Sequence, residues 1–434
     1  MKATILAAGE GTRLKPITSS LPKPMISIGG TPLLEHQILG LKNAGINDIL
    51  VIVGYKEEII KEYFKDGQQF GINIEYKTQE EYRGTADATA HAKEFVNNDT
   101  FIMMYGDVMV DKDFYKNLLQ FYQKSEADGL ISLLEVDNPQ NFGIINLDSE
   151  NFVRDIVEKP SPDMDVGNLA NAGIYIFPPE IFDAISKTEL SVRNEYELTD
   201  SIKIFIEKFN KKIIGYNIQD SYWNDIGLPW QLLEANEYIL DTIKRDIKGK
   251  IEDNVIIKGK VHIGDETIVK SGSYLQGPCF IGKRCIIGPN AYIRPGTSIQ
   301  DNCVIGRSEV KNSIVLSNSN GPHFNYIGDS IICENVNLGA GTKVANLRFD
   351  ESTIKVSIKK KVVDSERKKF GTIIGPNVKT GINVSIMCGK KIGQNSRIGA
   401  HTIVMENVPK NTLYYHDPEN GMIKKQKLGI EETL

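Results

Sequence analysis

Two glycines and two basic residues near the start of the chain could hold an anionic ligand. The run Thr4–Ala8 is short, apolar and rich in strand-forming residues, which predicts a buried first strand. Gly9 and Gly11 follow it, and they allow the backbone to turn sharply and to present its N–H groups to a negative charge. Arg13 and Lys23 add positive charge where a triphosphate would lie. The stretch therefore indicates a phosphate-binding loop.

This loop differs from two common nucleotide-binding loops. Leu14 occupies the place of the third glycine of a dinucleotide-binding fingerprint, and no Gly-Lys-Ser/Thr follows as in a Walker loop. Asp107 follows the apolar run Phe101–Tyr105, at the carboxyl end of a predicted strand, where open α/β sheets bind ligands. A second acid, Asp225, lies in the stretch Trp-Asn-Asp-Ile-Gly. Taken singly, an ordinary strand-to-helix turn or a turn-capping aspartate would also explain each feature.

Strand and helix patterns alternate through the first half of the chain. Four runs have the length and apolar content of strands, namely Asp48–Val53, Ile72–Tyr76, Phe101–Tyr105 and Leu130–Val136. Helical periodicity occurs in Leu33–Ala44, Ala86–Val96, Phe114–Lys124 and Leu198–Phe209. The alternation predicts a Rossmann-like α/β domain with a mostly parallel sheet and helices on both faces. From Pro229 to about Asp246 the pattern predicts one long helix that connects this domain to the next.

The sequence changes in character after Lys250, where Ile-Gly and Leu-Gly pairs recur. Gly264 lies 18 positions before Gly282, which lies 6 positions before Gly288. A period of six with three periods per coil is typical of a parallel β-helix, in which aliphatic residues point inward and small residues turn the corners. An ordinary β-sandwich would not keep this phase over so long a stretch.

Two segments are expected to interrupt the repeat. Ser317–His323 is rich in turn-forming residues, and Lys359–Lys369 carries six basic residues against two acidic ones. The basic segment is either a solvated loop or a contact for the phosphates of a coenzyme. From about Glu406 the periodicity ends, which predicts a coil or a short cap.

Composition and charge restrict the class of protein. With 434 residues the chain is long enough for two or three domains. A net charge of -5 argues against a nucleic-acid-binding or membrane-binding surface, and no apolar run approaches the roughly 20 residues of a membrane helix. Met1 and Lys2 lead directly into a strand pattern, so we expect no secretory signal and a cytoplasmic protein. The five cysteines form no C-x-x-C pair, which predicts reduced packing thiols.

The motif G-x-G-T-R-L-x-P followed by P-K-P-M resembles the signature of the sugar-1-phosphate nucleotidylyltransferases. That resemblance implies attack of a sugar-1-phosphate on the α-phosphorus of UTP or dTTP, with release of pyrophosphate. Arg13, Lys23 and Asp107 match its catalytic positions, and Asp107 also joins Asp225 as a match to the acids that hold Mg²⁺. The matched nucleotide-binding positions are Leu6, Ala8, Gly9, Gly11, Thr12, Gln79, Gly84 and Thr85. The matched sugar-phosphate-binding positions are Gly143, Glu158, Lys159 and Asn171.

Later motifs resemble the acetyltransferase half of the bifunctional glucosamine-1-phosphate acetyltransferase/N-acetylglucosamine-1-phosphate uridylyltransferases. They are Gly321–Asp329, Asn335–Thr342 and Ala345–Leu347. Acetyl transfer to an amine needs a base that takes the ammonium proton, and His323 is the candidate. The amino-sugar-phosphate positions are matched by Arg294, Lys311, Tyr326, Asn337 and Asn346, with Lys355 as the candidate for a lysine that is otherwise unmatched. Ala340 matches a position beside the acetyl-CoA thioester, where a backbone N–H could support the oxyanion.

The whole chain looks most like the archaeal bifunctional sugar-1-phosphate nucleotidylyltransferase/acetyltransferases, since Leu347–Asp350 departs from the bacterial pattern. The resemblance implies a left-handed β-helix, Mg²⁺, acetyl-CoA as co-substrate, and a homotrimer with the coenzyme between neighbouring prisms. The expected domains are a nucleotidyltransferase domain at 1–228, a linker helix at 229–250, a β-helix acetyltransferase domain at 251–405 and a C-terminal tail at 406–434.

Two other functions stay open on the sequence. One is a glucose-1-phosphate uridylyl- or thymidylyltransferase whose β-helix serves only oligomerisation or regulation, as in ADP-glucose or GDP-mannose pyrophosphorylases. The other is a non-catalytic scaffold, like the translation exchange-factor subunits that share this architecture. The presence of Arg13, Lys23 and both aspartates speaks against the scaffold. UTP and dTTP stay alternatives, as do glucosamine and galactosamine phosphates.

Overall fold

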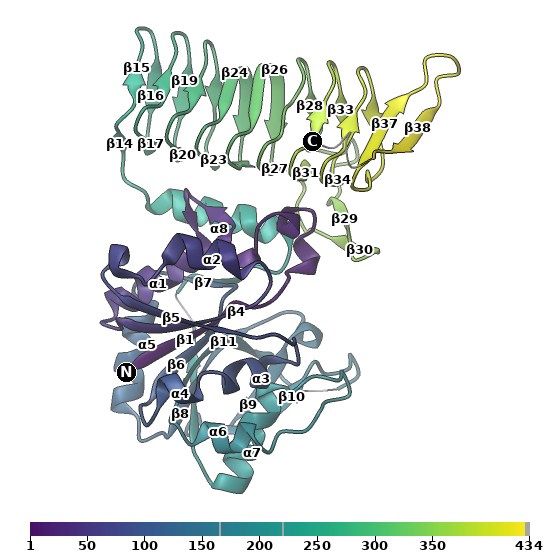
Figure 1. The fold of residues 1–434 in the computed structure, drawn as a ribbon. Helices are drawn as coiled ribbons and strands as arrows, with labels where there is room; N and C mark the ends of the chain where they lie inside the picture. Colours follow the sequence, from purple (N-terminus) through teal and green to yellow (C-terminus); the bar gives the residue numbers. More distant parts are fainter. Residues whose placement is uncertain (165, 219–220, 430–434) are drawn as a thin grey trace. The chain divides into compact units, whose positions relative to one another are not determined.

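The structure is a computed structural model that describes residues 1–164, 166–218 and 221–429. The chain forms two compact units (Figure 1). The first comprises residues 1–10, 22–25 and 32–225, and the second comprises residues 11–21, 26–31 and the chain from Ile226 onward. The chain therefore passes between the two units several times before residue 32.

The first unit is built on a nine-stranded mixed sheet. Its main order is β10-β9-β11-β6-β1-β4-β5, with β8 beside β11 and β12 beside β8. The strands are β1 (Lys2–Leu6), β4 (Asp48–Val53), β5 (Asn73–Thr78), β6 (Phe101–Tyr105), β8 (Gly129–Glu135), β9 (Gly143–Leu147), β10 (Val153–Glu158), β11 (Leu169–Phe177) and β12 (Ile213–Asn217). β6, β1, β4 and β5 are parallel, whereas β11 is antiparallel to β6, β8 and β9. The expectation of a mostly parallel sheet holds for one half only, because β11 runs back through the middle of the sheet.

Helices cover both faces of this sheet, as the sequence predicted. They are α1 (Leu33–Asn43), α2 (Glu57–Phe64), α3 (Thr85–Ala90), α4 (Lys93–Val96), α5 (Phe114–Lys124), α6 (Ile181–Ile185) and α7 (Leu198–Phe209). Alternate residues of β4 point to opposite faces, so Val51 joins the core under α1, α2 and α5 while Ile52 joins the core under α3, α6 and α7. Each face of the sheet therefore has its own buried apolar cluster.

The helix predicted at Ala86–Val96 consists of two short helices, α3 and α4. Ala86, Ala92 and Val96 are buried in one cluster across the interruption. The apolar periodicity continues through the interruption, and therefore it did not reveal the break.

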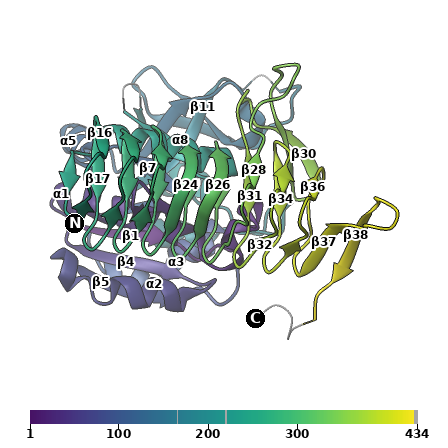
Figure 2. The same ribbon diagram turned by 90° about the horizontal axis from the view of Figure 1, so that it is seen from above.

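The second unit is dominated by a parallel β-helix, whose coils stack along the chain (Figure 2). One face consists of β14 (Asp246–Ile247), β17 (Val261–Ile263), β20 (Cys279–Ile281), β23 (Thr297–Ile299), β25 (Ile314–Val315), β27 (Ile331–Ile332), β31 (Thr372–Ile374) and β34 (Lys390–Ile392). A second face contains β15 (Lys250–Ile251), β18 (Ile268–Val269), β21 (Ile286–Ile287), β32 (Lys379–Thr380) and β35 (Arg397–Ile398). The third contains β16 (Ile256–Lys258), β19 (Tyr274–Gln276), β22 (Tyr292–Ile293), β28 (Lys343–Val344), β33 (Ser385–Ile386) and β36 (Ile403–Val404).

Two long strands, β24 (Val304–Lys311) and β26 (Asn320–Gly328), take part in both the second and third faces. Their register pairs Val304 with Asn320 and Val310 with Ile327. The expected interruption at Ser317–His323 is therefore wrong, because this segment is an ordinary coil that continues the stack. Its turn-forming residues reflect a corner, where Asn318 has a φ of 61°.

Aliphatic side chains fill the interior of the β-helix in successive layers. Val269, Ile287 and Ile305 belong to one buried cluster and lie in register on adjacent coils. Cys279, Cys285, Cys303 and Cys333 are free and buried, which confirms the prediction of packing thiols for these four, whereas Cys388 is half-buried. Corners also use asparagine in the left-handed conformation, which asparagine tolerates better than most residues: Asn254, Asn290, Asn302, Asn335, Asn377, Asn383 and Asn395.

Helix α8 (Pro229–Thr242) is shorter than the sequence pattern suggested, and β14 already pairs with β17 at Asp246. The basic segment Lys359–Lys369 includes β30 (Lys361–Asp364), which forms a hairpin with the preceding strand β29 (Lys355–Ile358). Near the C-terminus β37 (Thr412–His416) pairs with β35 and with β38 (Ile423–Lys427). This hairpin is the short cap that was one of the two expectations for the tail.

Within the described residues, no helix is long and apolar enough to cross a membrane.

Close approach of neighbouring coils predicts the effect of adding one methyl group at Gly264. A Cβ there would come within 2.7 Å of the Gly282 backbone, and the φ of Gly264 does not require glycine. Such overpacking costs about 1–3 kcal/mol. We expect Gly264→Ala to lower the denaturant midpoint of the β-helix, measured by circular dichroism.

Gly421→Ala serves as the control for that prediction. Gly421 has a φ of 69°, and a Cβ there would meet no atom within 4 Å, so only backbone strain is added. A loss of stability in Gly421→Ala that equals the loss in Gly264→Ala would contradict the argument from coil packing.

Candidate active sites

Asp107 lies at the carboxyl end of the central strand β6. Gly106 precedes it and donates its N–H to Leu6 O at 2.8 Å. A Cβ at Gly106 would come within 2.7 Å of the same oxygen, so only glycine allows the chain to stay this close to the end of β1. The Asp107 carboxylate is partly exposed and accepts a hydrogen bond of 2.5 Å from Lys23 Nζ. Two of the predicted catalytic residues are therefore in direct contact.

The second predicted acid lies next to the first through strand pairing. β13 (Trp223–Asp225) runs antiparallel to β7 (Val108–Val110) and pairs Asp225 with Val108, the residue after Asp107. Trp223 Nε1 donates to Ala172 O at 2.9 Å, which attaches β13 to β11. Positions more than one hundred residues apart in sequence are thus brought together by a separate two-stranded sheet of β7 and β13.

The Mg²⁺ implied by the sequence fits this pair of carboxylates. Mg²⁺ in phosphate-transferring proteins is held by one or two carboxylates together with substrate phosphates and water. Among the residues that the structure describes, no group of three or more His, Cys, Asp and Glu side chains could hold a metal. Asp107 and Asp225 bring two carboxylates to the paired strands β7 and β13, and carboxylate oxygen is a ligand type that Mg²⁺ takes.

The glycine loop combines open space with one left-handed turn. A Cβ at Gly9 would meet no atom within 4 Å, whereas Gly11 has a φ of 64°, which glycine adopts without strain. Within the second unit, a Cβ at Gly227 would come within 3.1 Å of the Arg13 guanidinium, so Gly227 makes room for that side chain. The remaining predicted loop residues lie at the end of β1 (Leu6), just after it (Ala8) and at the start of a short 3₁₀ turn (Thr12).

Gln79, Gly84 and Thr85 come together between β5 and α3. The Gln79 side chain is buried, and its Nε2 donates to Asp87 Oδ2 at 2.8 Å and more weakly to Gly84 O at 3.4 Å. Gly84 has a φ of 118°, and a Cβ there would come within 2.4 Å of Tyr196 O. Thr85 Oγ1 accepts a hydrogen bond from Leu198 N at 3.0 Å. The sequence reasoning did not identify Asp87, which nothing in the motif separates from an ordinary helix residue.

Glu158 and Gly143 face each other across the antiparallel pair β9–β10. A Cβ at Gly143 would come within 2.8 Å of Glu158 Oε2, so glycine leaves space for the carboxylate. Arg193 Nη2 donates to Glu158 Oε1 at 3.0 Å, and Thr199 Oγ1 donates to Glu158 Oε2 at 3.3 Å. Lys159 is half-exposed with Nζ 3.8 Å from Glu158 Oε1. Arg193 is a contact that sequence reasoning missed, since its loop carries no motif.

The Asn171 amide is occupied by neighbouring groups of the protein. Its Oδ1 accepts from Gly173 N at 3.0 Å, and its Nδ2 donates to the Tyr175 hydroxyl at 2.6 Å. The Tyr175 hydroxyl in turn donates to the Tyr105 hydroxyl at 3.1 Å, and burial raises the pKa of Tyr105 to about 12. A sugar at Asn171 would therefore meet an amide that is already held in one orientation by a chain of neutral hydroxyls.

In the β-helix, basic side chains line one corner on successive coils and each is paired with an acid. Arg294 Nη1 donates to Glu309 Oε1 at 2.8 Å, and this hydrogen bond raises the pKa of Arg294. Lys311 Nζ lies 3.2 Å from Asp329 Oδ2, and Asn346 Nδ2 donates to that oxygen at 2.5 Å. Three of the predicted amino-sugar-phosphate residues therefore lie at one corner.

Glu309 and Asp329 were not predicted as site residues. Asp329 is almost completely buried, with 2% of its side chain exposed, and it also accepts from Asn312 Nδ2 at 2.9 Å. The coil period could have identified it, since Lys311 and Asp329 are 18 positions apart and therefore stack. Glu309 follows from the pairing of β22 with β24, which the sequence pattern does not specify.

The third face connects this corner to His323. Tyr326 is in register with Glu309 on one side and Lys343 on the other, and its hydroxyl accepts from Asn346 Nδ2 at 3.3 Å. Burial raises the pKa of Tyr326, so its hydroxyl is neutral at physiological pH. His323 lies three residues before Tyr326 in β26, on the other side of a register shift at which Phe324 has a φ of 54°. It is exposed, and its imidazole has no hydrogen-bond partner among the described residues.

Asn337 and Ala340 lie on the coil that follows His323. Asn337 is exposed and forms bridges to Asn320 and Lys379, while Gly341 N donates to His323 O at 2.9 Å. Ala340 O accepts from Asn383 N at 2.7 Å. Within the described part of the chain, the Ala340 N–H donates to no protein group, so it is available to an external acceptor.

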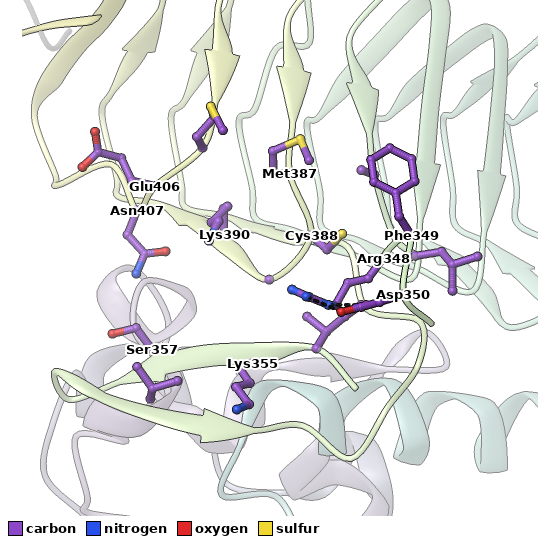
Figure 3. Close-up of a pocket in the computed structure, with 16 residues that line it drawn as sticks. Arg348, Phe349, Asp350, Lys355, Ser357, Met387, Cys388, Lys390, Glu406 and Asn407 are labelled. Atoms are coloured by element: carbon purple, nitrogen blue, oxygen red, sulfur yellow. Dashed lines mark hydrogen bonds and ion pairs between the residues drawn. The ribbon is translucent and has the colours of Figure 1, made fainter. Parts of the chain in front are cut away.

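Lys355 is separate from the corner that contains Asp329. It lies in β29, in register with Asp364, and it lines a cavity of about 810 Å³. Figure 3 shows Lys355 and Ser357 on the hairpin side of this cavity, with Met387, Lys390 and Glu406 on the coils that face them. The structure does not bring Lys355 into contact with the other predicted sugar-phosphate residues that it describes.

The basic insertion contacts acidic residues of α8. Arg367 is mostly buried and forms ion pairs with Glu234 at 3.3 Å and with Glu237 at 3.2 Å. Trp230 on the same helix packs edge-on against Phe370, with ring centroids 6.2 Å apart. The Arg367 guanidinium is therefore held by two carboxylates of α8.

Fold and sites together define a nucleotidyl transferase domain followed by a β-helix. The chain belongs to the nucleotidyl transferase family, whose model matches residues 2–242, and the model of the GMPPB C-terminal domain matches residues 275–379. It is 46% identical over 96% of its length to the bifunctional protein GlmU of Methanocaldococcus jannaschii, covering 98% of that protein. It is 43% identical over 94% of its length to the bifunctional sugar-1-phosphate nucleotidylyltransferase/acetyltransferase of Sulfurisphaera tokodaii, covering 98% of that protein.

Solved structures match the first half of the chain. A crystal structure described as a glucose-1-phosphate thymidylyltransferase of Bacillus anthracis is 28% identical, with a TM-score of 0.50, over 55% of this chain and 94% of that one. A UDP-glucose pyrophosphorylase bound to UDP-glucose is 25% identical, with a TM-score of 0.51, over 55% of this chain and 98% of that one.

The burial of Asp329 leads to a stability prediction. Asp329→Asn would leave Lys311 without its carboxylate in a mostly buried position, and leaving buried polar groups without partners costs about 1–3 kcal/mol. We expect a loss of that size in the free energy of unfolding, measured by urea denaturation. Glu309→Gln is the control, because its ion pair is about one-third exposed and should contribute less than about 1 kcal/mol. Equal losses in the two variants would contradict this reasoning.

Proposed function

We propose that the chain is a bifunctional enzyme that acetylates an amino-sugar-1-phosphate and then transfers a nucleotidyl group to the product. The β-helix would take glucosamine-1-phosphate and acetyl-CoA, and the first domain would take N-acetylglucosamine-1-phosphate or glucose-1-phosphate with UTP or dTTP. The observation that carries the proposal is the pairing of Asp225 with Val108, which makes the second acid a neighbour of Asp107 and its Lys23 partner.

In nucleotidyl transfer, a sugar-phosphate oxygen would form a bond to the α-phosphorus while the bond to the bridging oxygen breaks and pyrophosphate leaves. Two anions must approach each other, so the protein mainly supplies positive charge and positioning. Arg13 and Lys23 would supply the charge, with the Gly9–Thr12 loop, Leu6 and Ala8 around the triphosphate. Mg²⁺ bound by Asp107 and Asp225 would neutralise further phosphate charge.

The remaining residues of the first domain would bind the base and the sugar. Gln79, Gly84 and Thr85 would contact the pyrimidine, because they converge in one place. Glu158 would accept from sugar hydroxyls, and Lys159 would contact the sugar phosphate. Gly143 supports this role by leaving space for the carboxylate, and Asn171 would contact the sugar through its fixed amide.

In acetyl transfer, the amine nitrogen would attack the thioester carbonyl, and the C–S bond would break to release the coenzyme thiol. His323 would take the proton of the ammonium, since only the neutral amine attacks. Arg294 and Lys311 would bind the phosphate at one end of the third face, with Tyr326, Asn337 and Asn346 along the sugar. The free N–H of Ala340 would stabilise the oxyanion. Lys355 would contribute only if the hairpin approaches another subunit.

The same proposal includes a homotrimer that binds acetyl-CoA between neighbouring β-helices. Support for this assembly comes from the resemblance to bifunctional relatives that match nearly the whole chain. Analytical ultracentrifugation of the intact protein tests the assembly, and a monomer at all concentrations would contradict it.

The two reactions can be separated by substitution in the first domain. Asp107→Ala removes a proposed metal ligand and the partner of Lys23, so we expect pyrophosphate release from UTP or dTTP to fall by at least about 1,000-fold, consistent with loss of electrostatic stabilisation. Acetyl-CoA-dependent thiol release should stay within about twofold of the unchanged protein, because the β-helix site does not include Asp107. Equal loss of both activities would contradict separate sites.

The corresponding substitution in the β-helix is His323→Ala. Loss of a general base typically costs about 100- to 10,000-fold, so thiol release with glucosamine-1-phosphate should fall within that range. Pyrophosphate release with N-acetylglucosamine-1-phosphate should be unchanged. Absence of acetyl transfer in the unchanged protein would instead favour a β-helix that serves oligomerisation or regulation alone.

A further inference from the structure

One atom of the Gln79 side-chain amide is engaged and the other is not. Both hydrogens of Nε2 have acceptors, Asp87 Oδ2 at 2.8 Å and Gly84 O at 3.4 Å. Among the described residues, no group donates to Gln79 Oε1. A buried glutamine with its nitrogen bound and its oxygen unused presents a hydrogen-bond acceptor to whatever ligand lies beside it.

Asp87 determines which atom of the Gln79 side-chain amide stays without a hydrogen-bond partner in the described protein. Its side chain is 14% exposed, and Arg83 Nη2 lies 3.2 Å from Asp87 Oδ1, so that the other oxygen faces Gln79. An ionised carboxylate only accepts hydrogen bonds, so it can bind the amide nitrogen but not the amide oxygen. Rotation of the Gln79 amide by half a turn would place two acceptors against each other. The Asp87 carboxylate therefore holds the Gln79 amide in this orientation, and the weaker contact with Gly84 O favours the same orientation.

We propose that Asp87 is a positioning residue that makes the nucleotide site select bases with an N3–H donor, uracil and thymine, over cytosine. The inference rests on the proposed function, in which Gln79 faces the pyrimidine. Uracil and thymine carry a proton on N3, which Gln79 Oε1 can accept. Cytosine carries a lone pair on N3, which Oε1 would repel. A glutamine held in the opposite orientation would have the reverse preference.

The test compares Asp87→Asn with the unchanged enzyme. Asparagine has nearly the same shape, but its amide can pair with either atom of the Gln79 amide, so only the weak contact with Gly84 O still favours the present orientation. The kcat and KM for UTP, dTTP and CTP are measured by pyrophosphate release at saturating sugar phosphate. We expect the ratio of kcat/KM for UTP to that for CTP to fall by about tenfold or more, which corresponds to one buried hydrogen bond. The change should lie in KM, with kcat for UTP within about twofold.

Two further variants separate positioning from general disruption. Asp87→Glu keeps a carboxylate and should retain more of the UTP preference than Asp87→Asn. Glu94→Gln removes the same charge from a position 86% exposed, and should leave the ratio unchanged. A UTP to CTP ratio that is unaltered in Asp87→Asn, or an equal loss of kcat with all three nucleotides, would overturn the inference.

Equilibrium dialysis with UTP and CTP makes the result independent of turnover. Preferential binding of UTP that declines in Asp87→Asn supports the inference, even if no pyrophosphate is released. If binding is selective but no pyrophosphate is released, only the proposed reaction is wrong. Equal binding of UTP and CTP by the unchanged protein overturns the inference, whether or not nucleotidyl transfer is observed.

Discussion

Cations held by carboxylates are the interaction on which both candidate sites depend. Lys23 is paired with Asp107 in the first unit, and in the β-helix Lys311 is paired with Asp329 and Arg294 with Glu309. A lysine side chain loses considerable conformational entropy when it is held in one place, and an adjacent carboxylate compensates for that loss. Positive charge is therefore positioned before an anionic substrate arrives, which is what phosphate chemistry requires.

Backbone geometry determines how close these groups can come. In the first unit, Gly106 and Gly143 occupy places where a Cβ would collide with Leu6 O and with Glu158. In the β-helix, parallel pairing brings residues 17 or 18 positions apart into contact, so that Lys311, Asp329 and Asn346 meet at one corner. Side chains that are far apart in sequence become a continuous polar row because the coils that carry these residues have nearly the same length.

The sequence predicted helices and strands best where the apolar periodicity of the sequence agrees with the pattern of buried side chains. The helices α5 and α7 and the strands β4 and β6 begin and end at the predicted residues. Predictions were wrong where the local sequence pattern does not determine how the chain folds in three dimensions. The apolar period at Ala86–Val96 continues through a break between α3 and α4, and the turn residues of Ser317–His323 belong to an ordinary corner. The antiparallel direction of β11 depends on a return of the chain that no local pattern encodes.

By itself, the sequence predicted the two-part architecture and the glycine loop, because these depend on residue type, local spacing and a six-residue period. The candidate residues Asp107, Asp225 and His323 came from the resemblance of their motifs to known families. Only the tertiary structure decided which residues touch. It paired Asp225 with Val108, the residue that follows Asp107. It also brought Asp87 within hydrogen-bond distance of Gln79. It also buried Asp329 beneath Lys311 and separated Lys355 from that corner. Such contacts arise from pairing between distant strands and helices, whose register is selected by the packing of the whole core and not by any short segment.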